Sequence, residues 1–189
     1  MPEKDVPVAE VLAAAARWLE AAQVQYALVG GLVIGAWAEP RVTADVDVIV
    51  AATGDRVEEA LAQAKPLGFK FEKTRKAAQL RRQGMCRLFY GNRHFDVVCG
   101  TSAVEIRAIE RAVPVRLLGQ DVRVVTAEDL ILFKLLAARP QDLVDVQRVF
   151  QAQRGRLDKE YMRGVARQMA RDLFRSDIVK RLEEHLSER

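Results

Sequence analysis

The chain has 189 residues, of which 50% are hydrophobic and 30% are charged, and its formal net charge is +4. This length and composition are typical of a soluble globular protein and exclude a low-complexity chain. Residues 1–10 lack the pattern of a signal peptide, and the longest uncharged apolar run, residues 26–38, is too short to span a bilayer. We therefore expect a cytoplasmic protein that does not contact a membrane.

The first two thirds of the chain predict alternating helices and short strands. In chain order, we expect a helix over residues 8–22, a strand over 26–29, a helix over 32–38, a strand over 46–50 and a helix over 55–64. We then expect short strands over 69–73, 78–82, 85–90 and 94–98, and a hairpin formed by 113–117 and 122–125. Pro40 ends the second helix, because the residue before a proline is disfavoured in the α region.

The last third of the chain has helical character. Thr126, followed three residues later by Asp129, is typical of a helix N-terminus and leads into the apolar run LILFKLLA. Pro140 stands where proline is tolerated at the start of another helix, and residues 157–185 predict one or two more. We therefore predict an α/β (α+β) fold with a core over residues 1–125 and a C-terminal helical region over residues 126–189 packed on it.

Basic residues are concentrated between residues 65 and 93. This segment contains nine basic residues and one acid, Glu72. The basic residues are Lys65, Lys70, Lys73, Arg75, Lys76, Arg81, Arg82, Arg87 and Arg93. Such asymmetry indicates a phosphate-rich partner. The alternative is a solvated edge, because lysine and arginine are common on exposed strands.

A pair of carboxylates in an apolar strand is the first sign of chemistry. Asp45 and Asp47 are two residues apart, so both point to the same face of the strand, where burying them unpaired would be costly. Gly30-Gly31 follow the preceding strand and open a helix, so backbone N–H groups are available to a phosphate there. A third carboxylate, Asp96, lies in the strand HFDVV. Hard oxygen ligands beside a phosphate turn are what coordination of Mg²⁺ or Mn²⁺ requires.

These motifs together carry a family resemblance. The run GG-x13-D-x-D, with the later strand aspartate, resembles the nucleotidyltransferase superfamily that includes DNA polymerase β. Within it, GGLVIGAWAEPRVTADVDVIV is similar to the AbiEii-type toxins and their stand-alone relatives, and TAEDLILFKLLAARPQDLVDV resembles the second segment of that family. The resemblance implies the nucleotidyltransferase fold, in which a short mixed sheet is flanked by helices.

The resemblance also implies a role for each matching residue. It assigns Gly30 and Gly31 to the triphosphate, and Asp45 and Asp47 to the metal ions. Asp96 would be a further metal ligand that positions or deprotonates the acceptor hydroxyl. The remaining nucleotide-binding residues that it implies are Arg41, Thr43, Lys134, Asp142 and Asp145.

Three of these residues have simpler interpretations. Lys134 shares a helical face with apolar residues, so its stem can be buried while its ammonium reaches solvent. Asp142 lies in the first turn of a predicted helix, where a carboxylate stabilises the helix dipole. Arg41 can pair with Asp45.

The sequence predicts an enzyme that moves a nucleoside monophosphate from an NTP, such as ATP, to a hydroxyl and releases pyrophosphate with the help of Mg²⁺ or Mn²⁺. The resemblance implies an RNA end, such as that of tRNA, as the acceptor and an antitoxin protein as a partner. One alternative is nucleotidylation of a small molecule such as an antibiotic. Another is a non-catalytic module that binds nucleotide or nucleic acid. The basic segment favours a polyanionic acceptor, and the intact aspartates argue against the non-catalytic module.

Overall fold

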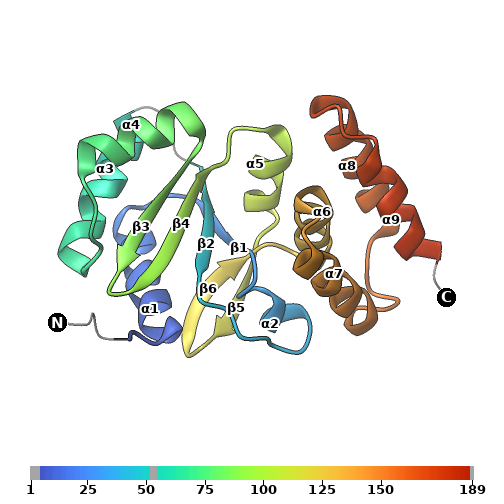
Figure 1. The fold of residues 1–189 in the computed structure, drawn as a ribbon, viewed down its shortest axis with the longest axis horizontal. Helices are drawn as coiled ribbons and strands as arrows, with labels where there is room; N and C mark the ends of the chain where they lie inside the picture. Colours follow the sequence, from blue (N-terminus) through green and yellow to red (C-terminus); the bar gives the residue numbers. More distant parts are fainter. Residues whose placement is uncertain (1–4, 52–54, 188–189) are drawn as a thin grey trace.

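The computed structural model describes residues 5–51 and 55–187. Its strands form one mixed sheet of six strands in the order β3-β4-β2-β1-β6-β5 (Figure 1). The strands are β1 (Tyr26–Val29), β2 (Val46–Val50), β3 (Met85–Tyr90), β4 (Arg93–Cys99), β5 (Val113–Leu117) and β6 (Gln120–Val124). The helices are α1 (Val8–Ala21), α2 (Ile34–Trp37), α3 (Asp55–Ala64), α4 (Lys73–Gln83), α5 (Ala103–Glu110), α6 (Ala127–Ala137), α7 (Pro140–Ala152), α8 (Lys159–Asp172) and α9 (Asp177–Ser187), with a 3-10 turn η1 (Lys65–Leu67).

The centre of the sheet brings the strands that carry the aspartates together. β2 lies between β1, with which it pairs antiparallel, and β4, with which it pairs parallel. In this register Asp47 lies opposite Val29 on one side and opposite Asp96 on the other. β3 pairs antiparallel with β4 and forms one edge of the sheet. Residues that lie opposite each other in a sheet point to the same face, so Asp47 and Asp96 share a face.

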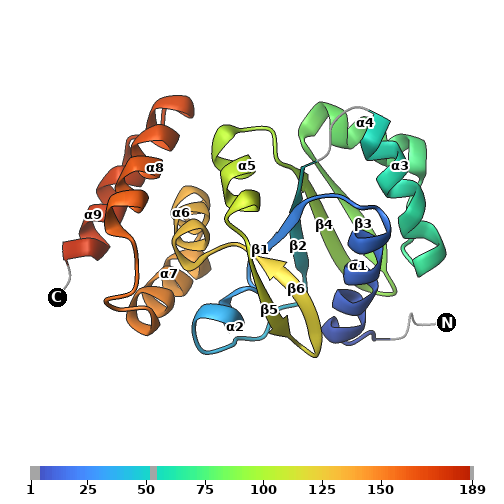
Figure 2. The same ribbon diagram turned by 180° about the vertical axis from the view of Figure 1, so that it is seen from behind.

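One face of the sheet packs against α1 and α4, and α3 packs on these two helices, beside β3 and β4 in Figure 2. The core under these helices is aromatic. Trp18 of α1 packs edge-on against Phe95 of β4, with ring centroids 5.5 Å apart, and Phe69 lies 5.3 Å from the same ring. Trp18 Nε1 also donates a hydrogen bond to the carbonyl of Ala60 in α3. Burial of these large rings provides much of the apolar area that stabilises this layer.

The opposite face, which carries Asp47 and Asp96, is covered in part by α5. Ile49 is two residues beyond Asp47 and therefore lies on the same face. A Cβ built on Gly100 would lie 3.1 Å from Ile49 Cγ2 and 3.1 Å from Ile109 Cδ1, so α5 packs closely on this end of β2. Asp47 lies nearer to the start of β2, toward the turn that follows β1.

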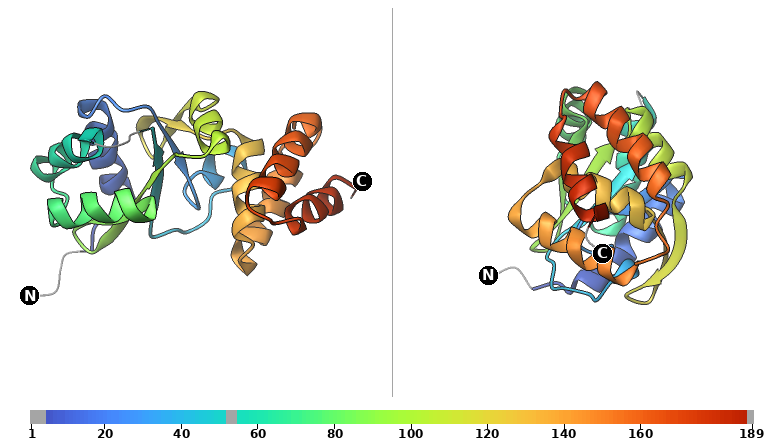
Figure 3. Two further views of the ribbon diagram at one scale, coloured as in Figure 1. Left: turned by 90° about the horizontal axis from the view of Figure 1, so that it is seen from above. Right: turned by 90° about the vertical axis from the view of Figure 1, so that its right-hand side faces the viewer.

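The helices α6 to α9 lie together beside the sheet, at the end of the molecule away from α3 and α4 (Figures 1 and 3). α6 is buried along most of its length. Its fully buried apolar side chains are Leu130, Ile131, Leu132 and Leu135. Within residues 5–51 and 55–187, we find no helix with the length and apolar character needed to cross a membrane.

Polar contacts connect α8 to the rest of the molecule. Tyr161 Oη of α8 donates a hydrogen bond of 2.5 Å to Asp129 Oδ1 of α6, and the Arg111 guanidinium lies 3.8 Å from the centre of the Tyr161 ring. Burial and the contact with Asp129 raise the pKa of Tyr161, which therefore stays a hydrogen-bond donor. Thr126 caps α6 by accepting a hydrogen bond from the Asp129 backbone, as the sequence predicts.

The predicted fold class is confirmed, whereas two predicted elements are wrong. The expected strand over residues 78–82 does not form, because residues 73–83 form the helix α4. Of the expected strand over residues 69–73, only Lys70 pairs, in an isolated antiparallel bridge with Phe89. Ala77 and Leu80 are both buried, and this spacing of three fits one face of a helix better than one face of a strand. The helix α5 is absent from the predicted elements. The division of the chain after residue 125 stays a prediction.

Candidate active site

The turn between β1 and α2 places its backbone against three of the predicted site residues. Gly30 has a φ of 77°, which glycine adopts without strain. A Cβ at Gly30 would overlap Oδ2 of Asp47, so this position requires glycine. A Cβ at Gly31 would lie 2.7 Å from Arg41 Nη2 and 3.0 Å from Thr43 Oγ1, and a side chain there would push Arg41 aside.

Three carboxylates, Asp45, Asp47 and Asp96, form an acid cluster on the face of the sheet next to this turn. Burial raises the pKa of Asp47 to about 6, with further contributions from the carboxylates of Asp96 and Asp45, while Lys134 and Arg87 act in the opposite direction. Ionisation of Asp47 is therefore opposed first by its burial and then by the neighbouring carboxylates.

Arg87 of β3 binds both oxygens of Asp96. Its Nε lies 2.7 Å from Oδ1 and its Nη2 lies 2.7 Å from Oδ2, which is the bidentate geometry of a strong charge-assisted pair. The hydrogen bond to Asp96 raises the pKa of Arg87. In the sequence Arg87 stands out only as one of many basic residues. The signal that identifies it is the two-residue turn Gly91-Asn92, because such a turn sets the hairpin register and places Arg87 opposite Asp96.

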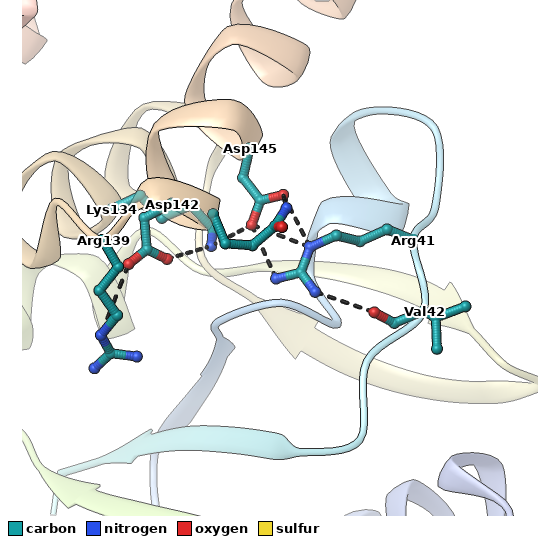
Figure 4. Close-up of polar contacts among 7 residues, drawn as sticks. Arg41, Val42, Lys134, Arg139, Asp142 and Asp145 are labelled. Atoms are coloured by element: carbon teal, nitrogen blue, oxygen red, sulfur yellow. Dashed lines mark hydrogen bonds and ion pairs between the residues drawn. The ribbon is translucent and has the colours of Figure 1, made fainter.

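A second group of charges, the buried ion network, joins the segment before β2 to α6 and α7 (Figure 4). Arg41 Nε and Nη2 each donate a 2.9 Å hydrogen bond to the carboxylate of Asp145. Lys134 Nζ donates to Asp145 Oδ2 over 2.7 Å and to Asp142 Oδ1 over 3.1 Å. Asp145 is 0% exposed and Lys134 is 5% exposed. Burial opposes ionisation of Asp145, but the hydrogen bonds from Arg41 and Lys134 hold its pKa below the ordinary value.

This network decides between the interpretations that the sequence leaves open. Arg41 pairs with Asp145 and not with Asp45. The Lys134 ammonium is buried between two carboxylates, so it does not extend into solvent. Asp142 lies in the first turn of α7 and also binds Lys134, so it does more than stabilise the helix dipole. Contact of these residues with a nucleotide stays a prediction.

The basic segment divides between the two faces of the sheet. Arg87 points to the acid cluster. Arg75, Lys76 and Arg82 of α4 border a hollow of about 550 Å³, and α4 packs on the other face. The side chains of Lys73 and Arg81 lie outside what the structure describes. A polyanion that contacts both groups would therefore have to pass around the β3 edge.

The acid cluster suits a divalent cation in its chemistry but is not yet arranged as a metal site. Carboxylate oxygens are the ligands that Mg²⁺ and Mn²⁺ prefer, and burial together with repulsion from Asp96 and Asp45 raises the pKa of Asp47. Among the residues that the structure describes, no group of three or more His, Cys, Asp or Glu side chains is placed to hold a metal ion. The carboxylates of Asp45 and Asp47 are of the right chemistry, whereas Arg87 occupies both oxygens of Asp96, and metal binding by the three stays a prediction.

The sequence also matches a family of known proteins. The family described as "Nucleotidyl transferase AbiEii toxin, Type IV TA system" matches residues 11–189. The chain belongs to the AbiEii nucleotidyltransferase family. The resemblance drawn from the glycine pair, the aspartate pair and the later helical segment is thereby confirmed. Among curated proteins, none matches this AbiEii chain.

Several solved structures share the fold of this AbiEii protein. The antibiotic-resistance factor ANT(2'')-Ia is 14% identical, with a TM-score of 0.60 over 89% of this chain and 96% of its own. The lincosamide antibiotic adenylyltransferase LnuA is 14% identical, with a TM-score of 0.54 over 77% of this chain and 98% of its own. JHP933 from Helicobacter pylori is 13% identical, with a TM-score of 0.51 over 94% of this chain and 82% of its own. At such identities the likeness shows the fold alone.

Proposed function

We propose that this AbiEii-family protein transfers a nucleoside monophosphate from an NTP to the hydroxyl of an RNA end, such as that of tRNA, in a reaction that depends on Mg²⁺ or Mn²⁺. The acid cluster beside the Gly30 turn carries the proposal, because it places Asp47, with Asp96 opposite it in the sheet, against a turn whose backbone N–H groups suit a phosphate. Carboxylates repel a triphosphate unless a cation lies between them. A site with both features therefore suits a nucleotide bound together with a metal ion.

Asp45 and Asp47 would hold the metal ion, and the backbone N–H groups of Gly30 and Gly31 would bind triphosphate oxygens. When bound, the ion would polarise the phosphoryl group and neutralise charge on the leaving pyrophosphate. The close approach of Asp47 to the Gly30 backbone supports this assignment, because it brings the metal ligands and the phosphate donors within the span of one triphosphate.

Asp96 would accept the proton of the acceptor hydroxyl. In this structure Arg87 binds both of its oxygens, so the proposal requires Arg87 to turn away when the substrates enter. The Arg87 side chain is 44% exposed and has room to do so. A guanidinium binds phosphate with the same bidentate geometry as carboxylate, so a substrate phosphate can replace Asp96 as its partner.

The buried ion network would support this site from the side. Arg41 and Thr43 lie against Gly31 and would hold the phosphate turn in place. Lys134 lowers the pKa of Asp47, so its charge acts on the acid cluster and would also act on a triphosphate bound there. Asp142 and Asp145 would orient Lys134 and Arg41.

Charge supports RNA as the acceptor. The pI is about 9.3 and nine basic residues lie within residues 65–93, which favours a polyanion. The family description names a toxin of a Type IV TA system, which supports an antitoxin as protein partner. Transfer to an antibiotic is the second candidate, favoured by the fold shared with the antibiotic-resistance factor ANT(2'')-Ia and the lincosamide adenylyltransferase LnuA.

The test is incubation with each α-labelled NTP in turn, with Mg²⁺ or Mn²⁺, and with total RNA, purified tRNA, an aminoglycoside or a lincosamide as acceptor. We expect label on RNA and release of pyrophosphate, both lost with EDTA and in the Asp47→Asn variant. Label on the antibiotic would select the second candidate. Binding of NTP without pyrophosphate release from any mixture would indicate a non-catalytic module and contradict the proposal.

A further inference from the structure

The edge strand β3 presents a row of exposed side chains on the face that carries the acid cluster. Met85 and Phe89 are 42% and 39% exposed, and the Arg87 side chain is 44% exposed. They alternate with Cys86 and Leu88, which are buried against the helices of the other face. We call Met85, Arg87 and Phe89 the β3 strip.

The β3 strip is continuous with the acid cluster at two points. Arg87 binds Asp96 directly. Phe89 lies opposite His94 in the hairpin, with ring centroids 5.3 Å apart and an interplanar angle of 85°, and His94 Nδ1 lies 3.7 Å from Asp45 Oδ1. An edge-on contact covers at most one face of the Phe89 ring, so the other face can accept a second planar group.

The backbone of β3 is not available to a partner strand at this position. The Phe89 carbonyl accepts a 2.7 Å hydrogen bond from the Lys70 backbone, and the Phe89 N–H donates to the Lys70 carbonyl over 3.3 Å. A ligand at the β3 strip therefore has to be recognised by side chains, which here are an aromatic ring and a guanidinium. These two groups together match a nucleotide, which has a planar base and a phosphate.

We propose that the β3 strip binds the terminal nucleotides of a single-stranded RNA acceptor, with a base stacked on Phe89 and a phosphate paired with Arg87. This inference rests on the proposed function, since an RNA acceptor brings a base and a hydroxyl to the site together. The contact chain from Phe89 through His94 to Asp45 places the stacked nucleotide beside the acid cluster. The phosphate that binds Arg87 releases Asp96, so entry of the acceptor frees the carboxylate that takes the proton from the hydroxyl.

The inference is tested by binding rather than by catalysis. A 5′-fluorescein-labelled, unstructured oligoribonucleotide is titrated with the full-length protein in Mg²⁺ without NTP, and anisotropy gives the dissociation constant. A base stacked on an aromatic ring contributes enough that Phe89→Ala and Phe89→Leu should each weaken binding about tenfold. Phe89→Trp should bind as well as wild type, because it keeps an aromatic face. Phe89→Leu keeps apolar volume, so it remains informative if Phe89→Ala fails to fold.

A matched control is available at the other end of the molecule. Phe174 is 94% exposed at the turn between α8 and α9, far from β3 in Figure 1, and Phe174→Ala should bind RNA like wild type. An oligoribonucleotide without bases on its two 3′-terminal residues should bind wild type about tenfold more weakly than the intact one and bind Phe89→Leu with no further loss. Equal binding of the intact and abasic oligoribonucleotides to wild type would overturn the stacking.

The same measurements separate this inference from the proposed reaction. A wild-type protein that binds no oligoribonucleotide, yet releases pyrophosphate from NTP with a small acceptor, would overturn the β3 strip as an RNA site and leave nucleotidyl transfer standing. A protein that binds RNA through Phe89 but never releases pyrophosphate would support the strip and refute the reaction.

Discussion

The acid cluster and the buried ion network both contain aspartates and basic side chains. They differ in whether the basic side chains match the aspartates. In the buried ion network, Asp142 and Asp145 are matched by Arg41 and Lys134, and Asp145 and Lys134 are almost fully buried. In the acid cluster, three carboxylates lie together, and the ion pairs that the described residues offer them are Arg87 with Asp96 and, when His94 is protonated, His94 with Asp45.

This difference in charge balance indicates a structural role for the buried ion network and a ligand-binding role for the adjacent acid cluster. A balanced, buried ion network is costly to break, because removing one partner leaves the other charge buried without compensation. Such a network holds elements in place. A partly open cluster with surplus negative charge gains from any cation that enters, so it suits a metal-bound substrate.

The largest expected effect comes from breaking the balanced network. Asp145→Asn leaves Arg41 and Lys134 with one carboxylate between them, so we expect the free energy of unfolding to fall by about 3–5 kcal/mol. Urea denaturation followed by circular dichroism measures the change. The matched control is Asp121→Asn, which removes an exposed pair with Arg116 and should change stability by less than about 1 kcal/mol. Equal effects of the two substitutions would show that the network does not hold the fold.

Removing a carboxylate from the acid cluster should lower activity without lowering stability. Asp47→Asn should raise the melting temperature at neutral pH, because it removes a carboxylate whose ionisation is opposed by burial and by repulsion from Asp96 and Asp45. Nucleotide transfer should fall by more than about a hundredfold, on the scale of losing one strong electrostatic group. Labelled-NTP transfer and thermal denaturation of the same preparation provide both values. A variant that transfers nucleotide at the wild-type rate would contradict the proposed site.

Stability should also depend on pH through Asp47, whose pKa of about 6 lies above the unfolded value of 3.8. The native state then holds a proton that the unfolded state has lost, so stability is full below about pH 4, falls as pH rises to about 6, and levels off above it. The loss should be roughly 2–3 kcal/mol. Urea denaturation from pH 4 to pH 8 gives the free energy of unfolding of wild type and of Asp47→Asn, and the difference between them isolates the contribution of Asp47. If the two free energies depend on pH in the same way, the raised pKa of Asp47 is ruled out.

Lys134 tests whether the two regions communicate. Lys134→Met keeps the stem but leaves Arg41 as the cation of the network, so we expect a loss of roughly 2 kcal/mol of stability, smaller than for Asp145→Asn because one pair survives. Lys134 also lowers the pKa of Asp47, and the variant should show a higher one by nuclear magnetic resonance titration. An unchanged Asp47 titration would mean that the charge of Lys134 does not reach the acid cluster.

The smallest expected effect is on RNA affinity, when a basic residue is replaced on one face of the sheet or on the other. Arg87→Gln should reduce RNA affinity several-fold and flatten its salt dependence by about 0.7 in log–log slope, which is the value for one phosphate contact on a single strand. Arg82→Gln on α4 should change the slope less, because α4 packs on the face away from the acid cluster. A larger change for Arg82→Gln would place the RNA path along α4.

Local features of the sequence determined much of the candidate site. The strand, the glycine pair and the Asp-x-Asp spacing follow from alternation and from the need for glycine at the Gly30 turn, both of which depend on residues close in the chain. The turn Gly91-Asn92 sets the register that pairs Arg87 with Asp96, so this contact too was accessible from the sequence.

Tertiary structure alone decided the partners of the long side chains. Arg41 reaches Asp145, which is 104 residues away, and Lys134 is buried because α7 packs beside α6. The basic run KTRKAAQLRRQ is a helix on the far face because Ala77 and Leu80 pack there. Local periodicity fixes which face a residue occupies on its own element, but which charge neutralises another depends on how distant elements pack, and the sequence does not state that packing.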